Sequence, residues 1–317
     1  MSRPIPFLLA AALACGLLGG CAFSDPRISG SPSGPVEVAP EFSQTAAAAT
    51  ELETQAWAEV TACATAPWAG DDAARWSVMA DVLLDHVAVL TGPAPQARLA
   101  ATPDPQPVGA AAAASREEGI ARADAALVAA RDAHRHAALA SDGVIAAFWA
   151  SLAGSAEQLR HGLTLPYRDP IPADPQVTVE VTAESNAYAR LVSAYHEAVF
   201  ATTTAIGVIP DDDPNRDIAS AIVTRLRQAR DTLIGEAPEF GFQAPAAQGA
   251  YTVARAATTD DALALMSEAH QAIAEAAIGW VASTSAHRRQ AVDEVIAATS
   301  LARELGLATA VWPGWPD

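Results

Sequence analysis

Apolar side chains recur every three or four positions through most of the chain, the spacing that puts them on one face of a helix. A clear example is the stripe formed by Trp76, Met79, Leu83, Val87 and Leu90. Gly and Pro separate the helical stretches, and the alternation typical of a strand is confined to the short run VTVEV. The pattern therefore predicts an all-helical protein.

Eight helices are expected, four in each half of the chain. The predicted ranges are about 43–65, 76–90, 116 onward and 143–163, then 183–206, 214–235, 260–282 and 286–305. Ser115 followed by Glu118 predicts a capping box at the third helix, and Asp213-Pro214 predicts an N-cap and a first-turn proline at the sixth.

The two halves share one order: helix, short loop, helix, long connection, helix, short loop, helix. Short loops make neighbouring helices antiparallel, and a long middle connection is typical of the ferritin-like bundle. We therefore expect two four-helix bundles, at 43–164 and 183–317, joined by a Pro-rich linker at 165–182. The second bundle is expected to be ferritin-like, with the long crossover between its second and third helices.

The first twenty residues have the features of a lipoprotein signal peptide. Arg3 is followed by the apolar stretch PFLLAAALACGLL, which is too short to span a bilayer comfortably, and then by Leu18-Gly19-Gly20-Cys21. This ending looks like a bacterial lipobox, in which small residues precede the cleavage site and the Cys21 thiol receives the lipid. Residues 21–42 are rich in Pro, Gly and Ser and are expected to form a flexible tether. The sequence thus predicts a protein anchored to the outer face of the bacterial cell membrane through lipid on Cys21.

Charge and cysteine content narrow the possible partners. The 317-residue chain has a net charge of −18, and its 19 basic residues are all Arg. This charge argues against nucleic acid and against direct contact with an anionic membrane surface as partners.

Cys15 would leave with the signal peptide and Cys21 would be lipidated, so Cys63 has no disulfide partner and is expected to be a small buried hydrophobe.

A dinuclear metal site of the ferritin type needs Glu-x-x-His on two helices, and this sequence contains no such motif. Histidines do lie on or beside apolar stripes in the second half: His196 at the edge of one, with Glu197 pointing away, and His270 near the centre of another. These two could hold a single softer cation such as zinc or copper. The alternative is that both are core histidines bonded to backbone or to Tyr195. In the first half, His134 falls on an apolar stripe, whereas His86 falls only at the edge of one.

The chain ends in VWPGWPD, in which two Trp are separated by Pro and Gly. This spacing cannot be helical. It predicts a tail that either docks back onto the helices or binds a partner protein.

Several segments resemble one known family. They are Leu18 to Cys21 and the stretches SLAGSAEQLRHGL, SAYHEAVFATTTAIG, RLRQARDTLI, HQAIAEAAIGWVAS and VWPGWPD. Together they resemble the uncharacterised ferritin-like lipoproteins of high-GC Gram-positive bacteria, and this resemblance implies a ferritin-like carboxyl-terminal domain and an envelope location. Family members often have Glu-His where this chain has Tyr195-His196, and a second His at the position of Leu226. The resemblance therefore implies that a complete di-metal site is missing here.

No nucleotide-binding loop, nucleophile elbow, Cys-x-x-Cys or dinucleotide fingerprint occurs in the sequence. We therefore expect a non-catalytic binding or scaffold module of the cell envelope, with an envelope protein as a possible partner. The alternative is a metal-dependent oxidoreductase or metal-binding protein that uses His196 and His270. A third possibility is that the helices capture a small apolar ligand.

Overall fold

The computed structural model describes residues 40–91, 110–165, 179–304 and 310–315. The expected signal peptide, Cys21, nearly all of the tether and most of the linker at 165–182 lie outside these ranges. Within them the chain forms eight α-helices and one short 3-10 turn, with no β-strand. The all-helical prediction is therefore confirmed.

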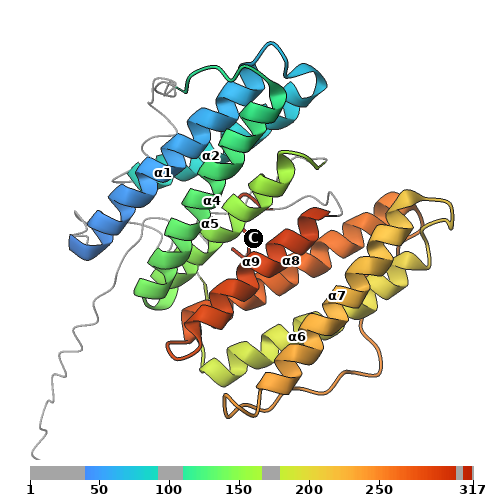
Figure 1. Ribbon diagram of the computed structural model, residues 1–317. Coiled ribbons are helices and arrows are strands. Elements are labelled where there is room, and N and C mark those ends of the chain that lie inside the picture. The colour runs from blue at the N-terminus through green and yellow to red at the C-terminus, as the bar shows by residue number, and fades with distance from the viewer. Residues whose placement is uncertain (1–39, 92–109, 166–178, 305–309, 316–317) are drawn as a thin grey trace, which may run out of the picture.

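The helices follow the predicted ranges to within a few residues (Figure 1). They are α1 (Pro40–Thr65), η1 (Gly70–Asp72), α2 (Ala73–Thr91), α4 (Arg116–Ala140), α5 (Gly143–Gly162), α6 (Glu184–Ile206), α7 (Pro214–Glu236), α8 (Thr259–Ser283) and α9 (Arg288–Glu304). The largest differences are at two amino ends, where α1 and α2 each begin three residues earlier than the apolar pattern indicated.

Local polar side chains explain where several helices begin. The Asp213 carboxylate accepts a bond from the Asn215 amide at 2.9 Å, directly before Pro214 in the first turn of α7. At α4 the Ser115 hydroxyl accepts from the Glu118 amide, but the Glu118 carboxylate bonds the amide of Ala114 instead of completing the predicted box.

A complete capping box opens α8, where the sequence pattern had not indicated one. The Thr258 hydroxyl accepts from the Asp261 amide at 3.1 Å, and the Asp261 carboxylate accepts from the Thr258 amide at 3.0 Å. Because this box satisfies two amides at the helix start, α8 begins at Thr259, one residue before the predicted position.

The two halves have the same order of helix contacts. In the first half α1 packs against α2 and α4, and α4 packs against α5. In the second half α6 packs against α7 and α8, and α8 packs against α9. The halves also pack against each other, because α5 contacts α8 and α9; these helices lie between the α1–α2 pair and the α6–α7 pair (Figure 1).

Helix α5 is buried on all sides for much of its length. Every residue from 146 to 159 is buried, although the stretch includes Ser151, Ser155, Glu157 and Gln158. A surface helix would show a polar face here. The many small residues of α5 let the neighbouring helices approach on every side, so this helix forms the centre of the molecule.

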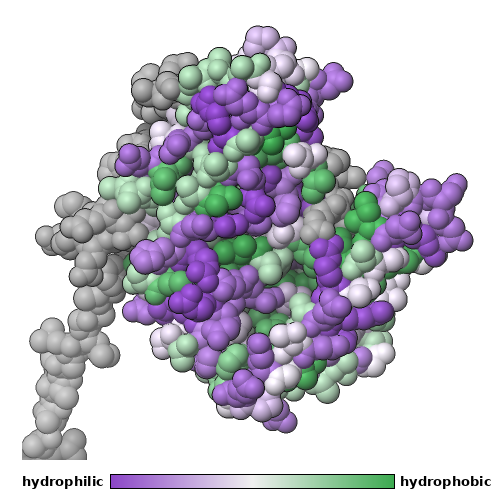
Figure 2. Space-filling view, in the orientation of Figure 1, coloured by the Kyte–Doolittle hydropathy of each residue, from purple (hydrophilic) through white to green (hydrophobic). Residues whose placement is uncertain are grey.

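Figure 2 shows polar side chains over much of one face, with smaller apolar areas between them. Among the described residues, the large hydrophobic side chains that are exposed are Val181, Ile218 and Ile234. In the same ranges, none of the helices combines the length and the apolar character needed to cross a membrane.

Candidate functional site

A buried carboxylate in the first half binds two histidines from different helices. Glu53 of α1 lies 2.6 Å from His86 of α2, between Oε1 and Nδ1, and 2.8 Å from His134 of α4, between Oε2 and Nε2. All three residues have 0% exposure. We call these three residues the Glu53 triad. It joins three helices at a point that solvent does not reach.

The histidines keep Glu53 ionised in spite of its burial. Burial alone would raise the pKa of this carboxyl, but the hydrogen bonds from His134 and His86 and their charge outweigh it and lower the pKa from 4.5 to about 2. The Glu53 side chain is therefore a carboxylate at neutral pH, and both of its oxygens accept hydrogen bonds.

The bonding partners also define where the protons lie on the two rings. His86 Nδ1 faces the Glu53 carboxylate, and His86 Nε2 lies 3.1 Å from the carbonyl oxygen of Val311. Both partners can only accept, so the two contacts are hydrogen bonds at the same time only when both nitrogens of His86 carry protons. His134 Nε2 faces the Glu53 carboxylate, and its buried Nδ1 has no hydrogen-bond partner among the described residues.

The carboxyl-terminal segment 310–315 docks directly beside the triad; we call it the tail. Its carbonyl oxygens accept three side-chain bonds: Ala310 from Gln158 at 2.8 Å, Val311 from His86, and Pro313 from Ser151 at 2.8 Å. Trp312 packs edge-on against His86, with ring centres 4.7 Å apart, and stacks on Phe148 of α5. Of the two accounts given for the tail, the structure shows docking onto the helices.

Gly314 lets the tail approach α8. Its φ of +73° belongs to the left-handed region, and a β-carbon there would lie 2.4 Å from the carbonyl oxygen of Ala274. The tail therefore contacts α2 and α5 of the first half and α8 of the second half at the same time.

A second polar contact, which is partly buried, lies in the second half. The Tyr195 hydroxyl of α6 donates a short hydrogen bond to the carboxyl of Glu294 on α9. Burial and the nearby charge of Glu236 raise the pKa of Glu294 and outweigh the opposing effect of the bond from Tyr195. Burial and Glu294 also raise the pKa of Tyr195. This contact connects α6 and α9, which are the first and last helices of the second half.

His196 and His270, the histidines predicted as metal ligands, are both buried, and each bonds to a carbonyl group. His196 Nε2 donates to Pro245 in the connection between α7 and α8 at 3.3 Å, and His270 Nδ1 donates to Met266 of its own helix at 2.7 Å. Burial lowers the pKa of His270. Its Nε2 is therefore a bare acceptor, with no hydrogen-bond partner in the described part of the chain. As predicted, Glu197 points to solvent and Tyr195 inward.

The described residues include no group of three or more His, Cys, Asp or Glu side chains arranged to hold a metal ion. The geometry of the Glu53 triad gives one reason. A cation such as zinc needs about 2.0 to 2.2 Å to each nitrogen and oxygen ligand. Nitrogen and oxygen only 2.6 and 2.8 Å apart are at direct hydrogen-bond distance, so the triad would have to open to admit an ion.

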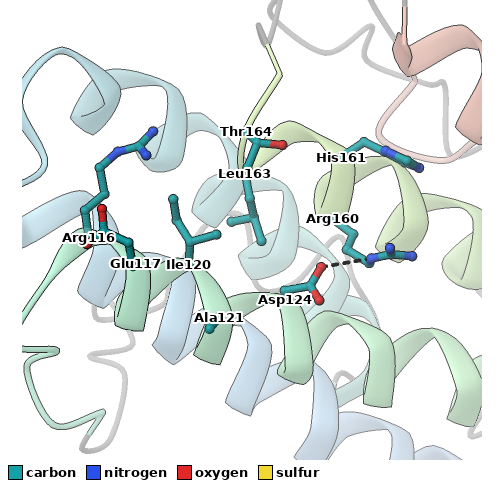
Figure 3. Close-up of a pocket in the computed structure, with 9 residues that line it drawn as sticks. All are labelled: Arg116, Glu117, Ile120, Ala121, Asp124, Arg160, His161, Leu163 and Thr164. Carbon is teal, nitrogen blue, oxygen red and sulfur yellow. Dashed lines mark hydrogen bonds and ion pairs between the residues drawn. The ribbon is translucent and has the colours of Figure 1, made fainter.

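A shallow pocket of about 430 Å³ lies between α4 and the end of α5 (Figure 3). Its basic groups are already paired: Arg160 bonds Asp124 at 2.9 Å, the contact drawn in Figure 3, and Arg116 bonds Asp72 at 2.7 Å. Because these charges are balanced by carboxylates, the pocket has no free excess of positive charge with which to select an anion.

The sequence reasoning missed the triad, and a signal for Glu53 was present. Glu53 is four residues after Ala49 and four before Trp57, so it lies on the buried face of α1. A carboxylate at such a position needs a buried partner. The identity of that partner could not be predicted from the local sequence, because His86 and His134 are 33 and 81 residues away.

Comparison with known proteins gave no match, whether with family models, curated proteins or solved structures. The function must therefore be argued from the sequence and the geometry of this chain alone.

Proposed function

We propose that the protein is a lipid-anchored helical module on the outer face of the bacterial cell membrane, where it acts as a binding or scaffold component of the envelope. The observation that carries this proposal is the sequence Leu18-Gly19-Gly20-Cys21 after a basic residue and a short apolar stretch. A lipid-modified amino-terminal cysteine can carry two or three acyl chains, and more than one chain is sufficient for stable anchoring. The net charge of −18 supports a protein partner over nucleic acid.

We also propose that each half is a four-helix bundle and that the second, 183–317, is ferritin-like. The shared order of contacts supports this organisation, because in both halves the first helix packs against the second and third, and the third packs against the fourth. The long connection between α7 and α8 would be the crossover of this bundle. The boundary between the bundles would lie in the linker at 165–182, and the bundles would still pack together through α5.

The chemistry of the interior supports a scaffold more than a catalyst. Glu53, His86 and Tyr195 are buried, Glu294 is half-buried, and these side chains bond to one another or to backbone groups. Side chains used in this way hold helices together, whereas a catalytic group must reach a substrate. A metal-dependent oxidoreductase using His196 and His270 is the second candidate, and the observation that favours it is the bare Nε2 of His270.

The anchoring proposal is tested by mass spectrometry of the protein purified from a bacterial host that performs lipoprotein processing. The expected amino-terminal peptide begins at Cys21 and has the added mass of a diacylglycerol group. The matched control replaces residues 1–21 with an ordinary secretory signal peptide, and this form should be released in soluble form with unchanged helix content. An unmodified Cys21, or membrane retention of the control form, would contradict the proposal.

The two candidate functions are separated by elemental analysis of protein purified without chelators. The scaffold proposal expects no stoichiometric metal. One metal ion per chain that is lost in both His196→Ala and His270→Ala, but not in His136→Ala on the exposed face of α4, would overturn it.

A further inference from the structure

The contact between His86 and the tail depends on a proton. The Val311 carbonyl oxygen can only accept, so its 3.1 Å contact with His86 Nε2 is a hydrogen bond only while that nitrogen carries hydrogen. The other nitrogen, Nδ1, already donates to the Glu53 carboxylate at 2.6 Å. Both contacts exist together only in the imidazolium form of the ring.

We propose that His86 makes docking of the tail sensitive to pH: the tail is held while His86 carries both ring protons, and it is loosened when the ring loses one. The remaining proton then stays on Nδ1, because the ionised Glu53 attracts it more strongly than a neutral carbonyl does. His86 Nε2 becomes a lone pair that faces the Val311 oxygen, so an attractive contact becomes a repulsive one. This inference is independent of the proposed function.

The surroundings of His86 are well defined on every side. Helix α1 contributes Glu53, α4 contributes the ring of His134, and α5 contributes the Ser155 hydroxyl, 3.4 Å from Nε2. The carboxylate that α5 does carry, Glu157, is paired with Arg131 and Arg160 instead. Asp85 of α2 itself points to solvent.

These surroundings set the direction of the response. Among the contacts that the structure describes, Glu53 is the one ionised group that bonds His86, and the tail presents to it only a carbonyl and the Trp312 ring. Because the bond to the Val311 carbonyl oxygen needs the proton on Nε2, docking is stronger when His86 carries both ring protons than when it has lost one. Docking therefore weakens as pH rises, and it does so through His86.

Loosening the tail would affect both halves of the molecule. The tail covers Phe148 of α5 with Trp312 and places Gly314 against Ala274 of α8. Release would expose two tryptophans and the surface that they cover. The charge of one buried histidine would therefore control whether the apolar surface under the tail, which belongs to both halves, is covered.

Amide hydrogen exchange tests this proposal. The Trp315 amide donates to the Trp312 carbonyl at 3.0 Å within the tail, and Trp315 is buried, so protection of this amide should fall when the tail leaves the helices. We would measure its protection factor in the full chain in detergent between pH 5 and 9, and follow the protons on His86 by the 15N chemical shifts of the ring. As His86 loses a proton, the protection factor should fall about 10-fold to 100-fold, the range expected when one hydrogen bond to a charged group is lost. The amide of Leu152 in α5 should keep its protection.

Variants show whether the response belongs to His86. His86→Gln should give protection at Trp315 that does not vary with pH, because the Gln amide has no proton to lose in this range, whereas His136→Gln, at an exposed position, should behave like wild type. If His86→Gln does not fold, the wild-type titration decides alone. Constant protection while the 15N shifts show that His86 loses its proton, 15N shifts that show no loss of a proton from His86 between pH 5 and 9, or an unchanged pH response in His86→Gln, would overturn the proposal.

Discussion

Gly154 of α5 lies directly against Thr299 of α9. A β-carbon at position 154 would be 3.1 Å from the Thr299 methyl carbon and 3.3 Å from a methyl carbon of Val295. Few real contacts are this short, so the absence of a side chain on α5 sets how closely the two halves approach.

Gly154→Leu should therefore destabilise the protein by about 1 to 3 kcal/mol, the usual cost of overpacking a filled interior. Urea unfolding would measure the change. The matched control is Gly235→Ala on α7, where a β-carbon meets no atom within 4 Å. This control should stabilise the protein by up to about 1 kcal/mol through helix propensity. If Gly154→Leu has wild-type stability, the described packing of α5 on α9 is wrong.

Glu53 should make the protein sensitive to acid. Its native pKa of about 2 is below the ordinary value of 4.5, so its contribution is complete above pH 4.5 and is lost as pH falls towards 2. The shift corresponds to about 3 kcal/mol. Glu53→Gln should remove this pH dependence and destabilise the protein at pH 7 by about 3 to 5 kcal/mol, because His86 then keeps a buried charge without its partner. Urea unfolding between pH 2 and 7 measures both effects, and Glu51→Gln, exposed on the same helix, should cause neither.

Glu294 should make the protein less stable as pH rises, whereas Glu53 makes it less stable as pH falls. Burial and the charge of Glu236 raise its native pKa above 4.5, so its contribution is complete below pH 4.5 and is lost as pH rises through the native value. Glu294→Gln keeps an oxygen that can accept from Tyr195 but cannot ionise. At pH 8 this variant should be more stable than wild type, and at pH 4 the two should be similar. Thermal unfolding at the two pH values provides the comparison, with Glu268→Gln as an exposed control; a variant that is less stable at pH 8 would refute the account.

Cys63 should be unreactive in the folded protein. It is buried, with 1% exposure, and burial together with the charge of Glu59 raises the pKa of its thiol to about 11. In a form that starts after Cys21, a thiol reagent at pH 8 should label no cysteine in buffer and one in urea. Fast labelling of the native form would show that the α1 surface facing Gly119 and Trp68 is open.

Gly314→Ala should release the tail. The added methyl group would lie 2.4 Å from the Ala274 carbonyl oxygen, and the φ of +73° is unfavourable for alanine. The result should be a red shift of tryptophan emission and lower protection of the Trp315 amide, with a loss of at least about 1 kcal/mol in stability. The control Gly241→Ala has a φ of +74° but no neighbour within 4 Å, so it should leave the tail docked.

The helices and the inward position of several side chains could be predicted from sequence, because these depend on local spacing. The stripe containing His270 and the outward direction of Glu197 are examples, and both agree with the structure. His86 was placed only at a stripe edge, yet it is fully buried. The reason is that the tail packs over His86. A helical wheel of α2 alone cannot predict contact with a segment more than 200 residues away.

The sequence by itself determined that the chain is helical and where most helices start and end, because local periodicity and caps are sufficient for both. Only the tertiary structure decided that Glu53 bonds His86 and His134, and that the tail supplies the partner of the second ring nitrogen of His86. Each of these contacts joins separate helices or the tail, and a buried charge is stable only where such distant partners come together.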